Sequence, residues 1–250
     1  MKIVSFVNET KEKLIENLLE ASGTGKLTRE KVPFKVGTAD VAVIRGGGIE
    51  KAAITHLIMN QITPPEATRP VDYMVFQMEI FPENPCCPMG HFNTEWALTG
   101  SGPYHMNLDL FPAVPCQQEI ALARAALDRV ADTFKVDKNK MREGLDDHYN
   151  MAHWDAPLAS MAGCKLMHLT GEQVDLFIAA YNTFFEAYLE IFRATKNKNY
   201  SEADTALKLK RNGRWLEYLT LKDPAVKMGL AAGIPPRVII SLSYPPSASF

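Results

Sequence analysis

The sequence predicts an α+β protein, built on an antiparallel β-sheet that is covered by helices. Alternating and short apolar segments cluster in the middle of the 250-residue chain and again near its end, whereas helical periodicity dominates from residue 117 onward. The predicted strands therefore follow one another in groups and do not alternate with helices. This order favours an antiparallel α+β sheet over an alternating α/β fold.

An amphipathic helix is expected near the N-terminus, over residues 10–21, where aliphatic side chains share one face. The polar stretch 26–33 follows as a loop. Four segments with short apolar runs or alternating side chains are predicted strands: residues 41–44, 71–81, 91–98 and 104–110. The last two are joined at residues 99–103, where glycine and proline predict a hairpin turn. The three prolines of residues 81–88 place a rigid loop before that hairpin.

Two helices are expected in the second half, one from residue 117 and a longer one from about residue 170. The aromatic stripe of the longer helix is typical of a buried core. A short helix over residues 201–210 would be capped by Ser201, with Asp204 three residues on. The C-terminal part is expected to return to strands: residues 215–221, 226–230 and 238–242.

The charge balance and the cysteines exclude several classes of protein. There are 27 Lys and Arg against 29 Asp and Glu, with a pI near 6.3, which argues against a generally basic nucleic-acid binder. No apolar run is long enough for a membrane span or a signal peptide, so a cytoplasmic protein is expected. The four cysteines form no C-x-x-C pair, which argues against a zinc ribbon and a disulfide scaffold.

Most of the candidate catalytic motifs have simpler explanations. The run Gly46-Gly47-Gly48 follows an apolar segment, but no phosphate-binding loop surrounds it, so a tight turn is expected there. There is no G-x-S-x-G serine nucleophile, and nothing orients a cysteine nucleophile. The six histidines show no spacing that selects a metal ion.

One predicted strand concentrates polar side chains on a single face. His91, Asn93 and Glu95 are two residues apart, and alternate residues of a strand share a face. A buried face of this kind is costly unless a ligand satisfies it. Asp109 lies in the next predicted strand between two leucines, and a hairpin would bring it beside His91.

Four motifs in order along residues 46–246 resemble the oxygen-dependent coproporphyrinogen III oxidases. They are G-G-I-E-K-A at 47–52, N-P-x-x-P-x-x-H-F-N at 84–93, D-L-F-P at 109–112 and R-N-G-R-W-L-E-Y at 211–218. The last is followed by K-M-G-L and V-I-I-S-L before two prolines. The resemblance implies one domain over residues 1–250 with a helical N-terminal extension over 1–40. It also implies a large antiparallel sheet with helices on both faces, and a homodimer.

The activity that the resemblance implies is the oxidative decarboxylation of two propionates of coproporphyrinogen III to vinyl groups in haem biosynthesis. Dioxygen is the oxidant, without a metal or an organic cofactor. Asp109 matches the carboxylate that would hold the pyrrole N–H groups, and His91 is the second catalytic candidate. The substrate-binding candidates are Asn93, Glu95, His105, Arg211, Arg214 and Gln77. Glu95 stands where the family has an arginine, and a glutamate repels a propionate that an arginine would bind.

A second resemblance is to the ferredoxin-dependent bilin reductases, which have a related fold. Phe81-Pro82-Glu83 and the loop after it are similar to a segment of that family. Gln77 and Asn93 then fall where the reductases carry histidine and aspartate, and proton delivery would pass to His91, Glu95, His105 or Asp109. A biliverdin reductase that receives electrons from ferredoxin, and a non-catalytic tetrapyrrole-binding protein, are the alternatives to the oxidase.

Overall fold

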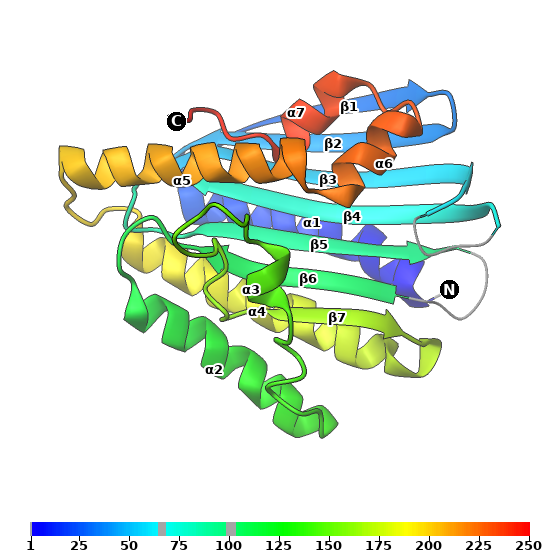
Figure 1. Ribbon diagram of the computed structural model, residues 1–250, viewed down its shortest axis with the longest axis horizontal. Helices are drawn as coiled ribbons and strands as arrows, with labels where there is room; N and C mark the ends of the chain where they lie inside the picture. The colour runs from blue at the N-terminus through cyan, green and yellow to red at the C-terminus, as the bar shows by residue number, and fades with distance from the viewer. Residues whose placement is uncertain (1, 65–68, 99–103) are drawn as a thin grey trace.

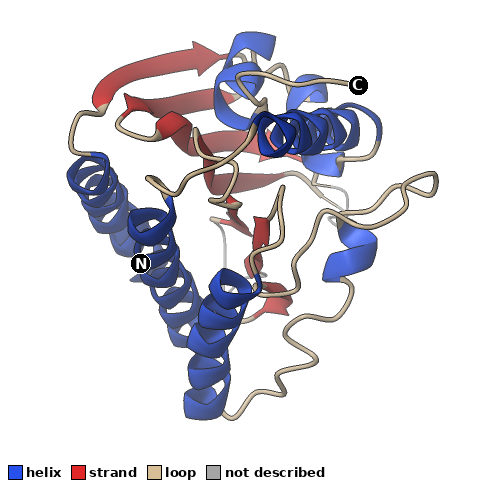
Figure 2. Cartoon of the chain, turned by 90° about the vertical axis from the view of Figure 1, so that its left-hand side faces the viewer, coloured by secondary structure: helices blue, strands red, loops and turns tan. Residues whose placement is uncertain are grey.

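The computed structural model describes residues 2–64, 69–98 and 104–250. Seven antiparallel strands form one sheet in the order β1 to β7, and helices cover both of its faces (Figures 1 and 2). The strands are β1 (Lys26–Phe34), β2 (Gly37–Gly46), β3 (Ile49–Ile62), β4 (Val71–Pro82), β5 (Met89–Ala97), β6 (Tyr104–Phe111) and β7 (Cys164–Leu169). The helices are α1 (Lys2–Ser22), α2 (Gln117–Phe134), α3 (Leu145–His148), α4 (Val174–Thr195), α5 (Glu202–Leu221), α6 (Pro224–Ala231) and α7 (Pro236–Ser243). The predicted fold class is confirmed.

The sheet is a meander, in which each strand pairs with the next one in the chain. The turn between β2 and β3 is made by the glycine run, whose φ angles are 96°, 65° and 89° at Gly46, Gly47 and Gly48. Residues with side chains rarely adopt these angles, so the run serves the tight turn that the sequence predicts. The predicted hairpin turn at residues 99–103 lies outside the described residues. Strands β3 and β7 were not among the predicted strands.

One face of the sheet carries the larger hydrophobic core, under α1, α2 and α4. The aromatic side chains of α4, among them Phe177, Tyr181 and Tyr188, are fully buried against residues such as Phe76 and Phe92 of the sheet. Their ring centroids lie 5.7 Å apart in the pairs Phe76–Tyr181 and Phe92–Tyr181. The stripe is therefore core, as the sequence predicts.

The other face is covered by α5, α6 and α7, which lie across β2, β3 and β4 in Figure 1. A second cluster of buried side chains, including Trp215, Tyr218 and Leu242, joins these helices to the sheet. Helix α7 is held at its C-terminal end by Lys51 of β3, whose ammonium donates to the carbonyls of Ile240, Ser241 and Tyr244.

The N-terminal prediction is partly wrong. The helix ends at Ser22, so the helical extension expected over residues 1–40 is helical only in its first half. Residues 26–33, expected to be a loop, belong to edge strand β1. That strand is charged and mostly exposed, a common way of protecting a sheet edge, and it therefore lacks the apolar alternation used to find strands.

The C-terminal prediction is wrong in a more consequential way. All three expected strands, residues 215–221, 226–230 and 238–242, are helical. Helix α5 begins at the predicted capping box of Ser201 and Asp204 but continues to Leu221. Helix α6 follows the side-chain cap of Asp223, and α7 begins at Pro236. A short apolar run fits both a buried strand and one face of a helix. The capping residues and the prolines at the helix starts are the signals that distinguish the two.

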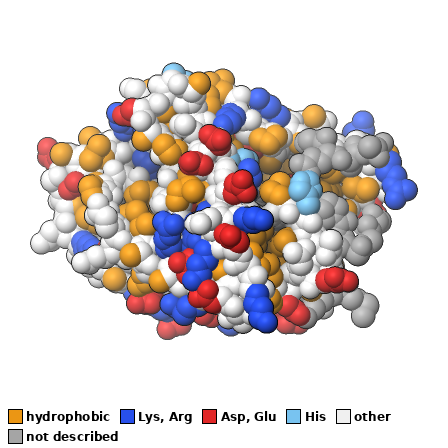
Figure 3. Space-filling model, turned by 60° about the horizontal axis from the view of Figure 1, so that its bottom comes forward, with side chains coloured by type: hydrophobic (Ala, Val, Ile, Leu, Met, Phe, Trp, Pro, Cys, Tyr) orange, Lys and Arg blue, Asp and Glu red, His pale blue; other side chains and the backbone are white. Residues whose placement is uncertain are grey.

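Acidic and basic side chains are interspersed over the face of the molecule shown in Figure 3. Among the described residues, no helix is both long and apolar enough to span a membrane.

Candidate active site

A cavity of about 380 Å³ lies on the sheet face that α5, α6 and α7 cover. Strands β4, β5 and β6 form its floor, while α6, α7 and the residues around α3 form its walls. Its lining is mainly apolar, with side chains such as Leu57, Val226 and Ile239. Such a site, largely apolar with a few convergent polar groups, is typical of a small-molecule pocket.

The polar floor is an ordered array across three strands. The sheet register places Gln77 of β4 opposite Asn93 of β5, and Asn93 opposite Asn107 of β6. Two residues further along β5, Glu95 lies opposite His105 of β6. The structure thus brings together five of the candidate residues, His91, Asn93, Glu95, His105 and Gln77, all of which line the cavity.

His91 forms a buried pair with a residue that the sequence analysis missed, Glu79 of β4. The Nδ1 atom of His91 lies 2.7 Å from Oε1 of Glu79, and the ring packs against Phe111 and Trp215. Because a carboxylate only accepts, Nδ1 carries the proton of this hydrogen bond. No partner of Nε2 is found among the described residues, so this atom is the one that can exchange a proton with a ligand.

Carboxylates fix the direction of two amides in the array. Asn93 donates from Nδ2 to Glu95 over 3.0 Å, and Gln77 donates from Nε2 to Glu79 over 2.7 Å. The buried Oδ1 atoms of Asn93 and Asn107 are left without a partner in the described part of the chain. Since a buried acceptor without a partner costs about 1–3 kcal/mol, the floor is built to receive hydrogen-bond donors.

The charges in the cavity wall are mostly negative. Asp223 caps α6 by accepting from the backbone of Ala225 at 2.7 Å, and burial raises the pKa of Asp223 to about 6. Burial lowers the pKa of His148, which also lines the cavity, to about 4, so this ring is neutral at neutral pH. Within the described ranges, Arg69 is the one lysine or arginine of the lining. No group of three or more metal-ligating side chains is found in the same ranges.

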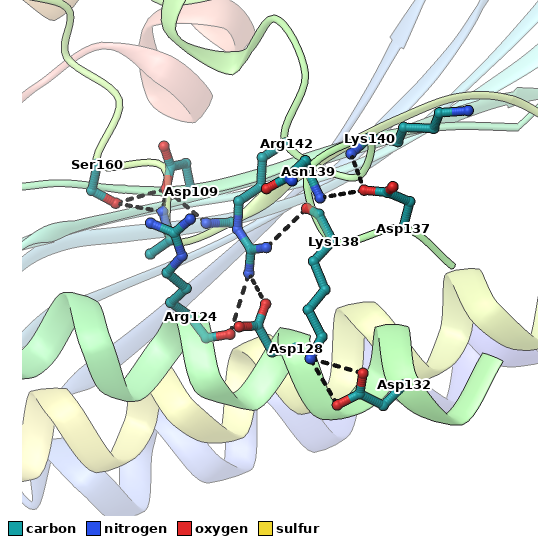
Figure 4. A network of polar contacts seen from close by, with 12 residues as sticks. Asp109, Arg124, Asp128, Asp132, Asp137, Lys138, Asn139, Lys140, Arg142 and Ser160 are labelled. Carbon is teal, nitrogen blue, oxygen red and sulfur yellow. Dashed lines mark hydrogen bonds and ion pairs between the residues drawn. The ribbon is translucent and has the colours of Figure 1, made fainter. Parts of the chain in front are cut away.

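Asp109 lies beside His91 in the sheet, as predicted, but it does not line the cavity. It is fully buried, and both carboxylate oxygens are occupied by the segment before β7 (Figure 4). Oδ1 accepts from Ser160 at 2.8 Å and from the amides of Ala162 and Gly163, while Oδ2 accepts from the amide of Met161. Burial raises the pKa of Asp109, and these hydrogen bonds oppose the shift. In this structure Asp109 holds a chain segment in place.

The two candidate arginines also lie outside the cavity lining. Arg211 is buried and donates to the carbonyl of Phe111 at 2.6 Å and to its neighbour Asn212. Burial lowers its pKa to about 10, so it stays charged at neutral pH. Arg214 forms an ion pair with Asp155 and lies over the ring of Trp154. Both guanidinium groups are engaged in contacts within the fold.

The residues that sequence reasoning missed had detectable signals. Glu79 stands two residues after Gln77, so the period-two argument applied to β5 would have placed both on the cavity face. Asp223 directly precedes Pro224, a pattern typical of a helix start. His148 and Tyr149 come from the irregular region around α3, for which the sequence offers no period.

Comparisons with known proteins agree with the motifs. A family model described as coproporphyrinogen III oxidase matches residues 2–250. An oxygen-dependent coproporphyrinogen-III oxidase of Coxiella burnetii is 26% identical over 234 residues, which cover 82% of this chain and 73% of that protein. The enzyme of the same name from Francisella tularensis subsp. novicida is 24% identical over 237 residues, which cover 86% and 76% of the two chains. With the model spanning nearly the whole chain, this protein belongs to the coproporphyrinogen III oxidase family.

Proposed function

We propose that this protein is an oxidoreductase that binds a tetrapyrrole in the cavity and oxidises it. The unpartnered acceptors of the floor carry the proposal. A porphyrinogen has four pyrrole N–H groups on the inside of its ring, and a row of amide and carboxylate oxygens is the surface that such donors need. The apolar walls would enclose the hydrocarbon edges of the ring.

The reaction proposed is that of the family, in which a propionate side chain becomes a vinyl group. The propionate and dioxygen, with one added proton, give vinyl, carbon dioxide and hydrogen peroxide. The substrate loses the carboxylate as carbon dioxide and one hydrogen from the carbon next to the ring, and dioxygen takes up the two electrons. His91 would transfer a proton at Nε2, and Glu79 would hold the ring in the required direction. A homodimer without a further cofactor belongs to this proposal.

The test is turnover of anaerobically prepared coproporphyrinogen when air is admitted. Vinyl products and peroxide should form together in equal amounts. His91→Gln and Glu79→Gln should lower kcat about 10²- to 10⁴-fold, the range for a general acid or base. His153→Gln, an exposed histidine that pairs with Glu217, is the matched control and should leave kcat unchanged. The proposal would be refuted if the protein bound no tetrapyrrole, or if the His91 and Glu79 variants both kept full turnover.

Bilin reduction is the second candidate, and one observation favours it. The cavity has a proton-transfer pair in His91 and Glu79 but few cations for carboxylates, and bilins of the biliverdin type carry two carboxylates where coproporphyrinogen carries four. This reaction needs two electrons and two protons from outside. Biliverdin should therefore change colour with reduced ferredoxin and stay unchanged with dioxygen alone.

A further inference from the structure

The cavity wall holds a tyrosine whose hydroxyl the fold does not use. Tyr149 lines the cavity directly after α3, and the residue is 1% exposed. Its hydroxyl makes no hydrogen bond to any residue in the described part of the chain. It is also not one of the fully enclosed polar atoms without a partner in that part, so the oxygen keeps contact with open space beside the cavity lining. A hydroxyl in this position is available to a ligand.

The two other tyrosines of the described lining are already engaged. The hydroxyl of Tyr73 donates to Oε2 of Glu95 at 2.8 Å. The hydroxyl of Tyr218 lies 3.2 Å from Nε2 of His148, which is neutral and accepts its proton in a hydrogen bond. Tyr149 is therefore set apart from both by a hydroxyl that a ligand can take without breaking a contact of the fold.

The side chain of Tyr149 is held in one orientation. Its amide donates to the carbonyl of Leu145 at 3.1 Å, and its carbonyl accepts from the amide of Leu158 at 2.9 Å. Five aromatic rings pack around its own, with centroids 4.6 to 6.2 Å away: His148, Phe111, His91, Tyr218 and Trp215. A donor fixed in this way needs no reorganisation when charge develops beside it.

The phenol also keeps its proton. Burial raises the pKa of Tyr149 well above 10, and neighbours such as Tyr218 and Glu79 raise it further. At neutral pH the group is therefore a neutral O–H donor. His91, whose ring centroid lies 5.2 Å from that of Tyr149, has its Nδ1 proton on Glu79 and can move a proton at Nε2. A fixed donor and a proton-transfer group are thus neighbours in one cavity.

The surroundings of this hydroxyl suit dioxygen better than a carboxylate. Dioxygen is uncharged and apolar when it arrives, so a shell of aromatic rings admits it readily. A carboxylate brings its charge with it, and the acidic groups that raise the pKa of Tyr149 are Glu79, Asp223 and Asp109. Dioxygen becomes an anion only when the porphyrinogen gives up electrons. A donor that acts at that stage stabilises the transition state without tightening the binding of the substrate.

We infer that the hydroxyl of Tyr149 receives dioxygen and donates a hydrogen bond to it while it is reduced to peroxide. This inference rests on the proposed function, because it takes dioxygen to be the oxidant of a porphyrinogen. The C–H bond next to the pyrrole ring and the bond to the carboxylate break, a C=C bond forms, and two electrons pass to dioxygen. One proton of the peroxide comes from that C–H bond through Nε2 of His91, and the other comes from solvent. Tyr149 keeps its own proton throughout.

The test is Tyr149→Phe, which removes one oxygen atom and keeps the ring. Initial rates of vinyl formation are measured at saturating coproporphyrinogen while the concentration of dioxygen is varied. The value of kcat/KM for dioxygen should fall about 10- to 100-fold, the range for a hydrogen bond to a charged group. The Kd of coproporphyrin III, measured by quenching of tryptophan fluorescence, should change by less than about twofold, because the hydroxyl acts on dioxygen. Urea unfolding should match that of the parent, since the hydroxyl has no partner in the fold.

Tyr181→Phe is the matched control. Tyr181 is fully buried and its hydroxyl also lacks a partner among the described residues, but it lies in the core on the opposite face of the sheet. Both kcat/KM for dioxygen and the Kd should be unchanged in this variant.

Three results would count against the inference. An unchanged kcat/KM for dioxygen in Tyr149→Phe would overturn it and leave the proposed function intact. Weaker binding of coproporphyrin, by a factor that accounts for the whole loss of activity, would assign the hydroxyl to a propionate and would also overturn it. A parent protein that forms no vinyl product from coproporphyrinogen and dioxygen would overturn the proposed function and the inference with it.

Discussion

Replacing Asp223 by asparagine should make the protein more stable at neutral pH. The carboxyl is half-buried in the cavity wall, and its Oδ1 accepts from the amides of Ala225 at 2.7 Å and Val226 at 3.3 Å. Asparagine keeps an oxygen at this position and is an equally good N-cap, so both hydrogen bonds survive. What the substitution removes is a half-buried negative charge.

The magnitude follows from the pKa of Asp223, about 6 in the fold against an ordinary value of 3.8. Between these values the folded state holds more protons than the unfolded chain. The free energy of unfolding therefore falls as pH rises through this window, and stays low above it. At 1.36 kcal/mol per pH unit the loss is about 3 kcal/mol, a net figure because the hydrogen bonds from Ala225 and Val226 already lower the pKa.

Urea unfolding, followed by tryptophan fluorescence at pH 5, 6, 7 and 8, measures the effect. Asp223→Asn should be more stable by about 2–3 kcal/mol at pH 8, and the difference should shrink toward pH 5. Asp204→Asn is the control of opposite sign, because hydrogen bonds from Ser201 lower the pKa of that exposed carboxyl. A variant of Asp223 that is less stable than the parent at pH 8, with an unchanged pH slope, would refute the reasoning.

Three further substitutions test the contacts that support the site. Asp109→Ala leaves the hydroxyl of Ser160 and the amides of Met161 and Gly163 without an acceptor, whereas the amide of Ala162 keeps Oγ of Ser160, and the variant should lose about 3–5 kcal/mol of stability in urea unfolding. An equally stable but inactive variant would restore the catalytic role that the resemblance implies. Gly163→Ala places its Cβ 1.6 Å from a carbonyl of β6 and should prevent folding to the native state, seen as lost near-ultraviolet dichroism. Gly144→Ala is the milder control: its Cβ meets only a flexible lysine end, so it should fold, at a cost of about 1–2 kcal/mol for the left-handed φ of 73°. Lys51→Met leaves three carbonyls at the end of α7 without a donor. The free energy of unfolding should fall by about 2–4 kcal/mol, and KM should rise. Unchanged thermal stability would contradict this prediction.

The fold class and one sheet face could be predicted because both depend on local periods. Alternation places His91, Asn93 and Glu95 together whatever the rest of the chain does. Helices α6 and α7 could not be separated from strands by their five-residue apolar runs. The sequence does contain the signals of their helix starts, which are Asp223 before Pro224 and the proline at position 236. The prediction relied on the apolar runs instead.

Where the site differs from the expectation, the cause is contact between distant parts of the chain. The resemblance implies that Asp109 holds a ligand, because it matches the family's carboxylate. In the fold, the segment 160–163 returns to occupy the carboxylate of Asp109. The wall of the cavity came from residues 223–243, which the sequence had assigned to the sheet. Because these residues were predicted to be strands, the helical wall of the cavity could not be predicted from the sequence, and neither could the cavity.

The meander has a consequence for the order in which the protein assembles. Strands β1 to β6 join neighbours in the chain, so their pairings close short loops and are kinetically accessible early. The cavity needs contacts between residues 73–107 and residues 218–243, which are more than a hundred positions apart. These contacts require the closure of a long loop, so we expect the cavity to form late in folding. A ligand that binds there should slow unfolding while leaving the refolding rate unchanged, the kinetic signature of interactions absent from the transition state.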